Sequence, residues 1–270
     1  MNPPSSPASP AENGPVPARR SGIGRRLLRW IVLVLLALVV GGALGLGTTA
    51  NGRAAAQAAL RWLDEQIHAQ SLAAAEQEAV QQLRQRGALV MADLPGGHVS
   101  SVNFLGKPID DEALRHLAAL HWVQSVDVSR TNIRDEQLRC LEPLGYLAAL
   151  SASATHLTDE GMDEIARLGA LEQLVITETR IGDDGLRRIA RARNLVVLDL
   201  CHTRVTDAGV AALVGMPRLR QLVLDSDDIT DAAIADLEKI PSLRQVELRG
   251  SRVTAEGQKR MERALQGFMQ

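Results

Sequence analysis

Aromatic side chains are scarce in this chain: its 270 residues include two Phe, one Tyr and three Trp. A core must then be filled by Leu, Ile, Val and Ala, which is typical of repeat proteins built from aliphatic layers. Cysteine is also scarce. The two residues present, Cys140 and Cys201, exclude a disulfide framework and a four-ligand zinc site.

Basic residues are outnumbered by acidic ones outside the N-terminal segment. Residues 1–48 hold five Arg and one acid, Glu12, so the rest of the chain has 25 basic and 31 acidic residues. Phosphate binding requires a basic face. We therefore expect no nucleic-acid partner.

Catalytic motifs are lacking as well. The sequence has no nucleophile elbow, no phosphate-binding glycine loop, no HExxH motif and no clustered metal ligands. Cys201 and His202 are adjacent, but neighbours on a strand point to opposite faces, so a thiol and its base are not expected there. The sequence predicts no enzyme, no cofactor and no metal.

Charge is absent from the 18 residues Trp30 to Gly47, which follow an Arg cluster. At 1.5 Å per residue this run spans roughly 27 Å, near the ~30 Å hydrocarbon thickness of a bilayer. The basic flank predicts a single-pass membrane protein with a cytoplasmic N-terminus and an extracytoplasmic remainder. A cleaved signal peptide stays open as the alternative, since Thr48-Thr49-Ala50 and Ala54-Ala55-Ala56 offer small residues for cleavage.

The segment from Arg53 to Arg86 contains no Pro or Gly and is rich in strong helix formers. We expect a stalk helix that Gly87 ends, then a short strand over residues 88–92 and a turn at Pro95-Gly96-Gly97. Two roles for the helix remain open: docking of its last turns on the next domain, or weak self-association.

From residue 97 the chain repeats every 24 residues. In the fifth unit, RNLVVLDLCHTRVTDAGVAALVGM, the alternation predicts a strand with Leu198 and Leu200 facing inward. Thr206 is a good N-cap and Asp207 suits the first helical turn; for these repeated Thr-Asp pairs, capping is favoured over metal binding. Strands are predicted near Ser101, Ser125, Ala149, Gln173, Val197, Gln221 and Gln245, and helices near Asp111, Asp135, Asp159, Asp183, Asp207, Asp231 and Glu256.

The units, L-x-x-L-x-L followed by T-x-[IV]-T-D-x-G-[LV], resemble the leucine-rich-repeat family over residues 97–270. The variable half is similar to the cysteine-containing subclass of F-box-type substrate receptors, and closer still to bacterial tandem arrays. Thr131, Thr155, Thr179 and Thr203 stand where that subclass has Cys or Asn, and a hydroxyl there can hydrogen-bond the neighbouring turn. No F-box is visible upstream.

The resemblance implies an α/β fold: a right-handed solenoid of seven 24-residue repeats, with a parallel β-sheet on the concave face and helices on the convex face. One transmembrane helix and a stalk helix would precede it. The expected organisation is a disordered basic tail (1–29), a transmembrane helix (30–50), a helical stalk and N-terminal cap (51–96) and the repeat domain (97–270).

Outward strand positions are the candidate protein-binding surface. Early repeats carry small groups there, whereas later ones mix Val with amides and acids, which is nearer the composition of a recognition surface. The predicted residues are Gln173, Val175, Thr177, Val197, Asp199, Gln221, Val223, Asp225, Glu247 and Arg249. The competing interpretation is that the Val residues serve β-propensity and that Asp225 pairs with Arg249 on the next strand.

These features predict a membrane-anchored leucine-rich-repeat protein that binds a protein partner, not identifiable from sequence, through its concave sheet. Two alternatives stay open: a secreted or envelope-structural repeat protein after signal cleavage, and an adaptor of the F-box type.

Overall fold

The computed structural model describes residues 61–62, 72–92 and 97–268, and Ser71–Gln270 form one compact unit. The predicted tail, the predicted membrane span and much of the predicted stalk lie outside the described residues, as does most of the predicted turn at residues 95–97. Within the described ranges, no helix is long and apolar enough to cross a membrane.

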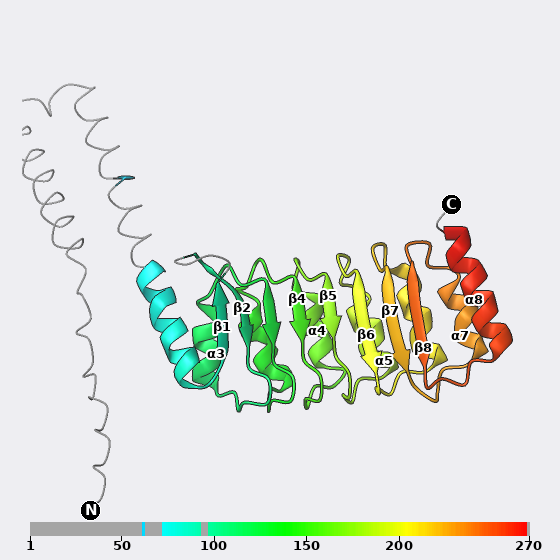
Figure 1. Cartoon of the computed structure of the whole chain (residues 1–270), viewed down its shortest axis with the longest axis horizontal. Helices are drawn as coiled ribbons and strands as arrows, with labels where there is room; N and C mark the ends of the chain where they lie inside the picture. Colours follow the sequence, from blue (N-terminus) through cyan, green and yellow to red (C-terminus); the bar gives the residue numbers. More distant parts are fainter. Residues whose placement is uncertain (1–60, 63–71, 93–96, 269–270) are drawn as a thin grey trace, which may run out of the picture. The chain divides into compact units, whose positions relative to one another are not determined.

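One sheet runs through the compact unit, with its strands in chain order (Figure 1). Strands β2 to β8 are parallel, and each register partner lies 24 residues further along, as in Ser125↔Ala149↔Gln173. The predicted positions and direction of these strands are confirmed. The strands are β1 (Leu89–Ala92), β2 (Val99–Asn103), β3 (Ser125–Asp127), β4 (Ala149–Ser151), β5 (Gln173–Val175), β6 (Val197–Cys201), β7 (Gln221–Asp225) and β8 (Gln245–Arg249).

The first strand differs from the others. β1 pairs antiparallel with β2, with Val90 opposite Val102. The sequence predicted a strand here but not its direction, because residues 88–92 precede the repeat whose period sets the parallel register. The right-handed winding and the count of seven repeats stay predictions.

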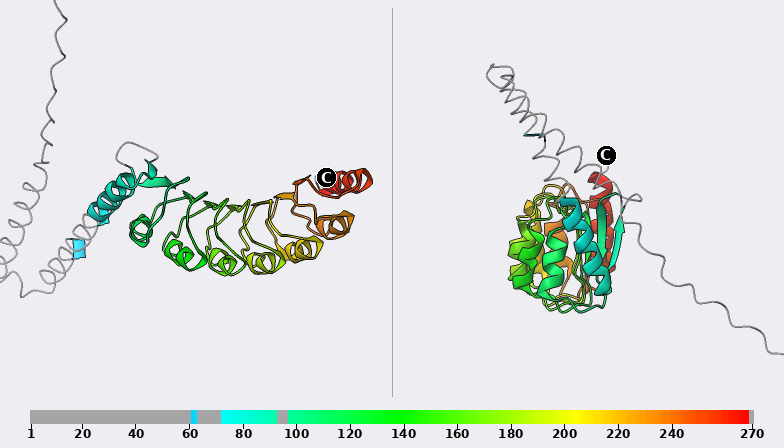
Figure 2. Two further views of the ribbon diagram at one scale, coloured as in Figure 1. Left: turned by 90° about the horizontal axis from the view of Figure 1, so that it is seen from below. Right: turned by 90° about the vertical axis from the view of Figure 1, so that its left-hand side faces the viewer.

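Short helices cover the convex side, the strands line the concave side, and the longer last helix lies beyond the final strand at the C-terminal end (Figures 1 and 2). Five helical segments begin at the predicted aspartates, whereas α4 begins at Gly161, two residues after Asp159, and α8 at Ala255. Two units contain 3₁₀ turns, the tighter helix that is common in short segments. The segments are α3 (Asp111–Ala118), η2 (Asp135–Leu141), α4 (Gly161–Ala166), α5 (Asp183–Ile189), α6 (Asp207–Val210), η3 (Ala211–Gly215), α7 (Asp231–Leu237) and α8 (Ala255–Phe268).

An aliphatic core lies between the sheet and these helices. The inward residues Leu150, Leu174, Leu198 and Leu222 are register partners and are at most 1% exposed. A helix over residues 72–85 packs on the same core, because Ala79 and Leu83 are buried in it. Of the two roles left open for this helix, the burial supports docking of its last turns on the repeat domain.

Several strands are followed by a residue in the left-handed backbone conformation. Arg130, Ala154, Glu178 and His202 have φ between 52° and 58°. The Thr that follows Arg130 donates its hydroxyl hydrogen to the carbonyl three residues earlier, Thr131 to Val128 at 2.6 Å, and Thr155 and Thr179 do the same at 2.7 and 2.9 Å. These hydroxyls close the turn of their own repeat, so the prediction of a bond to a neighbouring turn is corrected.

Candidate protein-binding face

The outward strand side chains form continuous rows across the concave face, because the parallel register is unbroken from β2 to β8. Most of these side chains are half-buried between their neighbours. One row is Ser101, Ser125, Ala149, Gln173, Val197, Gln221 and Gln245. The next is Asn103, Asp127, Ser151, Val175, Asp199, Val223 and Glu247. Helices lie on the opposite side of the sheet (Figure 2), so this face is the free surface of the sheet.

A hollow of about 290 Å³ lies over the N-terminal half of this face. Its outward lining residues are small or polar: Ser101, Asn103, Ser125, Asp127, Ala149, Ser151, Gln173 and Val175. Only the last two belong to the predicted binding set. The sequence interpretation favoured the later repeats because the early ones carry small groups, but these small side chains leave a depression that a partner side chain can enter.

The C-terminal half carries the remaining predicted residues. Val197, Asp199, Gln221 and Asp225 are half-buried at outward positions, and Thr177 lies two residues beyond β5. Val223 departs from the prediction of an exposed contact, because it is only 9% exposed. Its register partners Asp199 and Glu247 flank it on both sides.

Arg249 pairs within its own strand. Its Nη2 lies 2.6 Å from Oε2 of Glu247. The competing interpretation of an Asp225–Arg249 pair is therefore wrong, although the two residues are register partners. Asp225 has His202 beside it instead, with 3.8 Å between Oδ2 and Nε2.

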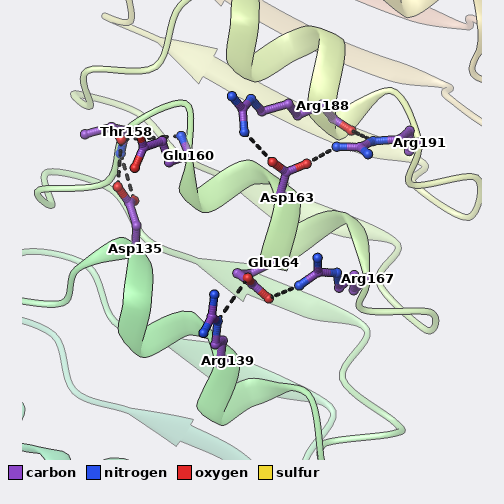
Figure 3. A network of polar contacts seen from close by, with 9 residues as sticks. All are labelled: Asp135, Arg139, Thr158, Glu160, Asp163, Glu164, Arg167, Arg188 and Arg191. Atoms are coloured by element: carbon purple, nitrogen blue, oxygen red, sulfur yellow. Dashed lines mark hydrogen bonds and ion pairs between the residues drawn. The ribbon is translucent and has the colours of Figure 1, made fainter.

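Two acidic side chains of α4 on the convex side each contact two arginines (Figure 3). Asp163 contacts both Arg188 and Arg191. Glu164 lies 3.1 Å from Arg139 and 2.6 Å from Arg167. Burial raises the pKa of Glu164, but the two guanidinium groups outweigh it and the pKa is lowered. Asp163 and Glu164 thus have cationic partners from the chain itself, whereas Glu136 and Glu160 on the same side have no Lys or Arg nitrogen within 4.0 Å among the described residues.

Two carboxylates on the concave face accept hydrogen bonds from the chain but contact no Lys or Arg side chain among the described residues. Asp127 accepts hydrogen bonds from the Asn103 amide at 3.0 Å and the Ser129 N–H at 2.9 Å, and Asp199 accepts one from the Cys201 N–H at 3.1 Å. Within the described part of the chain, no Lys or Arg nitrogen lies within 4.0 Å of either carboxylate. The concave face therefore presents negative charge that a partner can neutralise.

The thiol of Cys201 shares this acidic setting. Burial raises its pKa to about 12, and the hydrogen bond and charge of Asp199 act in the same direction. A thiol nucleophile reacts as the thiolate, which this environment disfavours at neutral pH. The surroundings of Cys201 on the concave face therefore favour the neutral thiol.

Hydrogen bonds between repeats join the start of one helix to the residue that precedes the next helix. The Asp183 carboxylate accepts the N–H and the hydroxyl of Thr206, each at 2.8 Å. The same arrangement recurs in Asp135–Thr158, Asp207–Thr230 and Asp231–Thr254. The N-cap prediction for Thr206 is confirmed, since its hydroxyl oxygen accepts the Ala208 N–H at 3.2 Å. The sequence interpretation missed that the aspartates bind the next repeat.

This bonding explains the glycine of the T-D-x-G segment. A Cβ on Gly209 would lie 2.3 Å from Oδ1 of Asp183. Glycine thus leaves room for the carboxylate of the preceding repeat. The 24-residue spacing of the Asp and Gly residues was the signal in the sequence.

Residues 191–214 match the family model described as "Leucine Rich repeat". The match supports the leucine-rich-repeat family. No curated protein matches the chain. Similar solved structures include internalin C2 of Listeria monocytogenes, with 21% identity and a TM-score of 0.41 over 50% of this chain and 55% of that chain. Another is the internalin InlF of the same organism, with 17% identity and a TM-score of 0.44 over 54% and 48%. The chain spans about half the length of each internalin.

The sequence interpretation also missed an aromatic stack at the start of three of the 24-residue repeats. His98, Trp122 and Tyr146 stack with 5.0 Å between successive ring centroids. Trp122 is 45% and Tyr146 55% exposed. Such aromatic contacts between successive repeats add to their packing where the chain enters β2, β3 and β4, and Glu76 contacts His98 at 2.9 Å. The spacing of these three residues in an aromatic-poor chain was the available signal.

Proposed function

We propose that this chain is a membrane-anchored leucine-rich-repeat protein that binds a protein partner on its concave sheet face and catalyses no reaction. The observation that carries the proposal is the open concave sheet face, whose outward rows no helix covers (Figure 2). On this face Asp127 and Asp199 have no Lys or Arg partner among the described residues.

The shape of the face supports the same function. A curved sheet surface with half-exposed polar side chains and a shallow hollow suits an extended surface of another protein better than a small molecule, whose sites are usually deeper and more apolar. The predicted set from Gln173 to Arg249 and the hollow over β2 to β5 together cover the whole length of the parallel sheet.

The anchor is proposed from the sequence. Residues 30–50 contain no charge and follow five arginines, which favours a single span with the repeat domain on the extracytoplasmic side. The partner would then be a protein of that compartment.

Site-specific photo-crosslinking in the native membrane tests the proposal. A photoreactive side chain is placed in the full chain at Gln173 or Gln221 on the concave face, and at Glu136 or Glu160, both exposed near the helix starts, as matched controls. We expect protein adducts of one size from the two concave positions only. Adducts from the convex positions, with none from the concave ones, would place the partner on the helical side and reject the proposal.

A further inference from the structure

Three large apolar side chains are exposed together at the N-terminal end of the concave face: Leu89, Met91 and Leu105, which are 68%, 65% and 51% exposed. Leu89 is the register partner of Asn103 and Met91 that of Ser101, so both share the face of the hollow. Leu105 lies two residues beyond Asn103, at the repeat position that Cys201 holds in β6. We name these three residues the N-terminal apolar cluster.

Packing does not explain this cluster. The inward neighbours Val90 and Val102 bury their side chains in the core, whereas Leu89 and Met91 point away from it. β-Propensity accounts for branched residues in a strand, but Leu and Met are not among the strongest strand formers. Exposed apolar groups that gather beside a polar rim are typical of surfaces that bind protein.

The hollow next to the cluster favours a partner that carries positive charge. Asp127 lines it and has no Lys or Arg within 4.0 Å in the described part of the chain. A volume of about 290 Å³ is at the lower limit for a small-molecule site, so it fits one or two side chains. Guanidinium and ammonium groups are the natural partners of a carboxylate in such a position.

We infer that the N-terminal half of the concave face binds an extended segment of a partner protein that carries an apolar residue for the cluster and an Arg or Lys for Asp127. The inference rests on the proposed function, since it names the partner chemistry for the same face. β1 and β3 are separated by two strand intervals of ~4.8 Å, and an extended chain advances ~3.3 Å per residue. The apolar and basic residues of the partner are therefore two to four positions apart.

The test is selection of a random dodecapeptide display library on the full chain held in a lipid nanodisc. We expect enriched peptides that combine Arg or Lys with Leu, Ile, Met or Phe at that spacing. A synthetic peptide of the enriched sequence is then measured against variants. Asp127→Asn, and separately Met91→Ser, should each weaken its binding at least tenfold. Glu136→Gln, an exposed acid at the start of η2, is the matched control and should leave binding unchanged.

The outcomes separate this inference from the proposed function. Two outcomes would overturn the inference and leave the concave face as the binding face. The first is enrichment of acidic peptides. The second is enrichment of basic peptides that bind both variants normally but lose binding with Asp199→Arg. Peptides whose binding ignores all concave variants would overturn both. Self-association of the full chain that Met91→Ser abolishes would assign the cluster to a second copy and overturn the inference. Unchanged thermal melting of each variant checks that the fold is intact.

Discussion

Asp183 and Thr206 belong to neighbouring repeats and are joined by two hydrogen bonds of 2.8 Å, one to each oxygen of the carboxylate. The Thr206 hydroxyl also caps the helix that begins at Asp207. One threonine thus links the helix of its own repeat to the first residue of α5, the helix of the preceding repeat. Because the pair recurs along the domain, adjacent repeats are coupled, as expected for solenoids stabilised by nearest-neighbour contacts.

Removing this carboxylate should be costly. We expect Asp183→Ala to lower the free energy of unfolding by about 2–3 kcal/mol, because two donors of Thr206 lose a charged acceptor. The neighbouring Asp184 is exposed and contacts only Arg187 on the surface. Asp184→Ala is the matched control, with an expected loss below about 1 kcal/mol. Urea unfolding of both variants measures the difference, and equal losses would show that the hydrogen bonds between repeats do not stabilise the domain.

The same bonds predict a pH dependence. Hydrogen bonds from the hydroxyl and the N–H of Thr254 lower the pKa of Asp231 from its ordinary value of 3.8. A carboxyl whose folded pKa is depressed adds stability above its unfolded pKa and loses that stability as pH falls through the folded pKa. The domain should therefore weaken below about pH 4. Thr254→Val should return the Asp231 pKa, followed by NMR, toward the ordinary value. A pKa that does not move in this variant would mean that the Thr254 hydroxyl is not the main cause of the shift.

The strand pattern made much of this fold predictable. Leu198, Leu200 and their equivalents alternate with outward residues at an unbroken 24-residue period, and the predicted starts of β3 to β8 match the structure. The helix starts were predictable where an Asp follows a capping residue, as at Asp207. α4 was displaced because the Thr158-Asp159 pair leads into a turn before the helix begins at Gly161.

The candidate face was less predictable. Composition identified outward Val and Asp residues, but it did not show that Val223 is covered by its neighbours or that Arg249 bonds Glu247 within one strand. The burial of a side chain and its choice of ion-pair partner depend on side-chain conformation and local packing. A periodic sequence pattern gives no information on either. The hollow was missed for a related reason: it forms where small side chains leave space beside larger neighbours, and this depends on the folded packing.

Core packing is tested by a pair of adjacent residues. In β6, the side chain of Leu198 is fully buried on the core side of the sheet, and that of Val197 next to it is half-buried on the outer face. Leu198→Ala should destabilise the domain by roughly 2–5 kcal/mol, the usual range for a large-to-small change in a packed core. Val197→Ala should cost less than about 1 kcal/mol. Chemical denaturation of both variants measures the costs, and the reverse order would invert our assignment of the two strand faces.

Membrane attachment is tested by truncation. Deletion of residues 1–52 should leave a soluble, folded protein, because the compact unit begins at Ser71. The intact chain should require detergent, and a topology reporter fused to the C-terminus should report an extracytoplasmic position. A cytoplasmic signal would contradict the orientation that the N-terminal arginines predict. A mature protein that starts after residue 50 would favour a cleaved signal instead.

Charge reversal on the concave face tests the central claim most directly. The full chain with Asp127→Arg and Asp199→Arg is compared in partner capture with a control that carries Glu136→Arg and Glu160→Arg, two exposed acids near the helix starts, so both variants change the charge equally. Val223 is left unchanged because it is buried. We predict that the concave variant loses capture while both variants melt like the wild-type chain. Full capture by the folded concave variant, with loss in the control, would contradict binding through the sheet face.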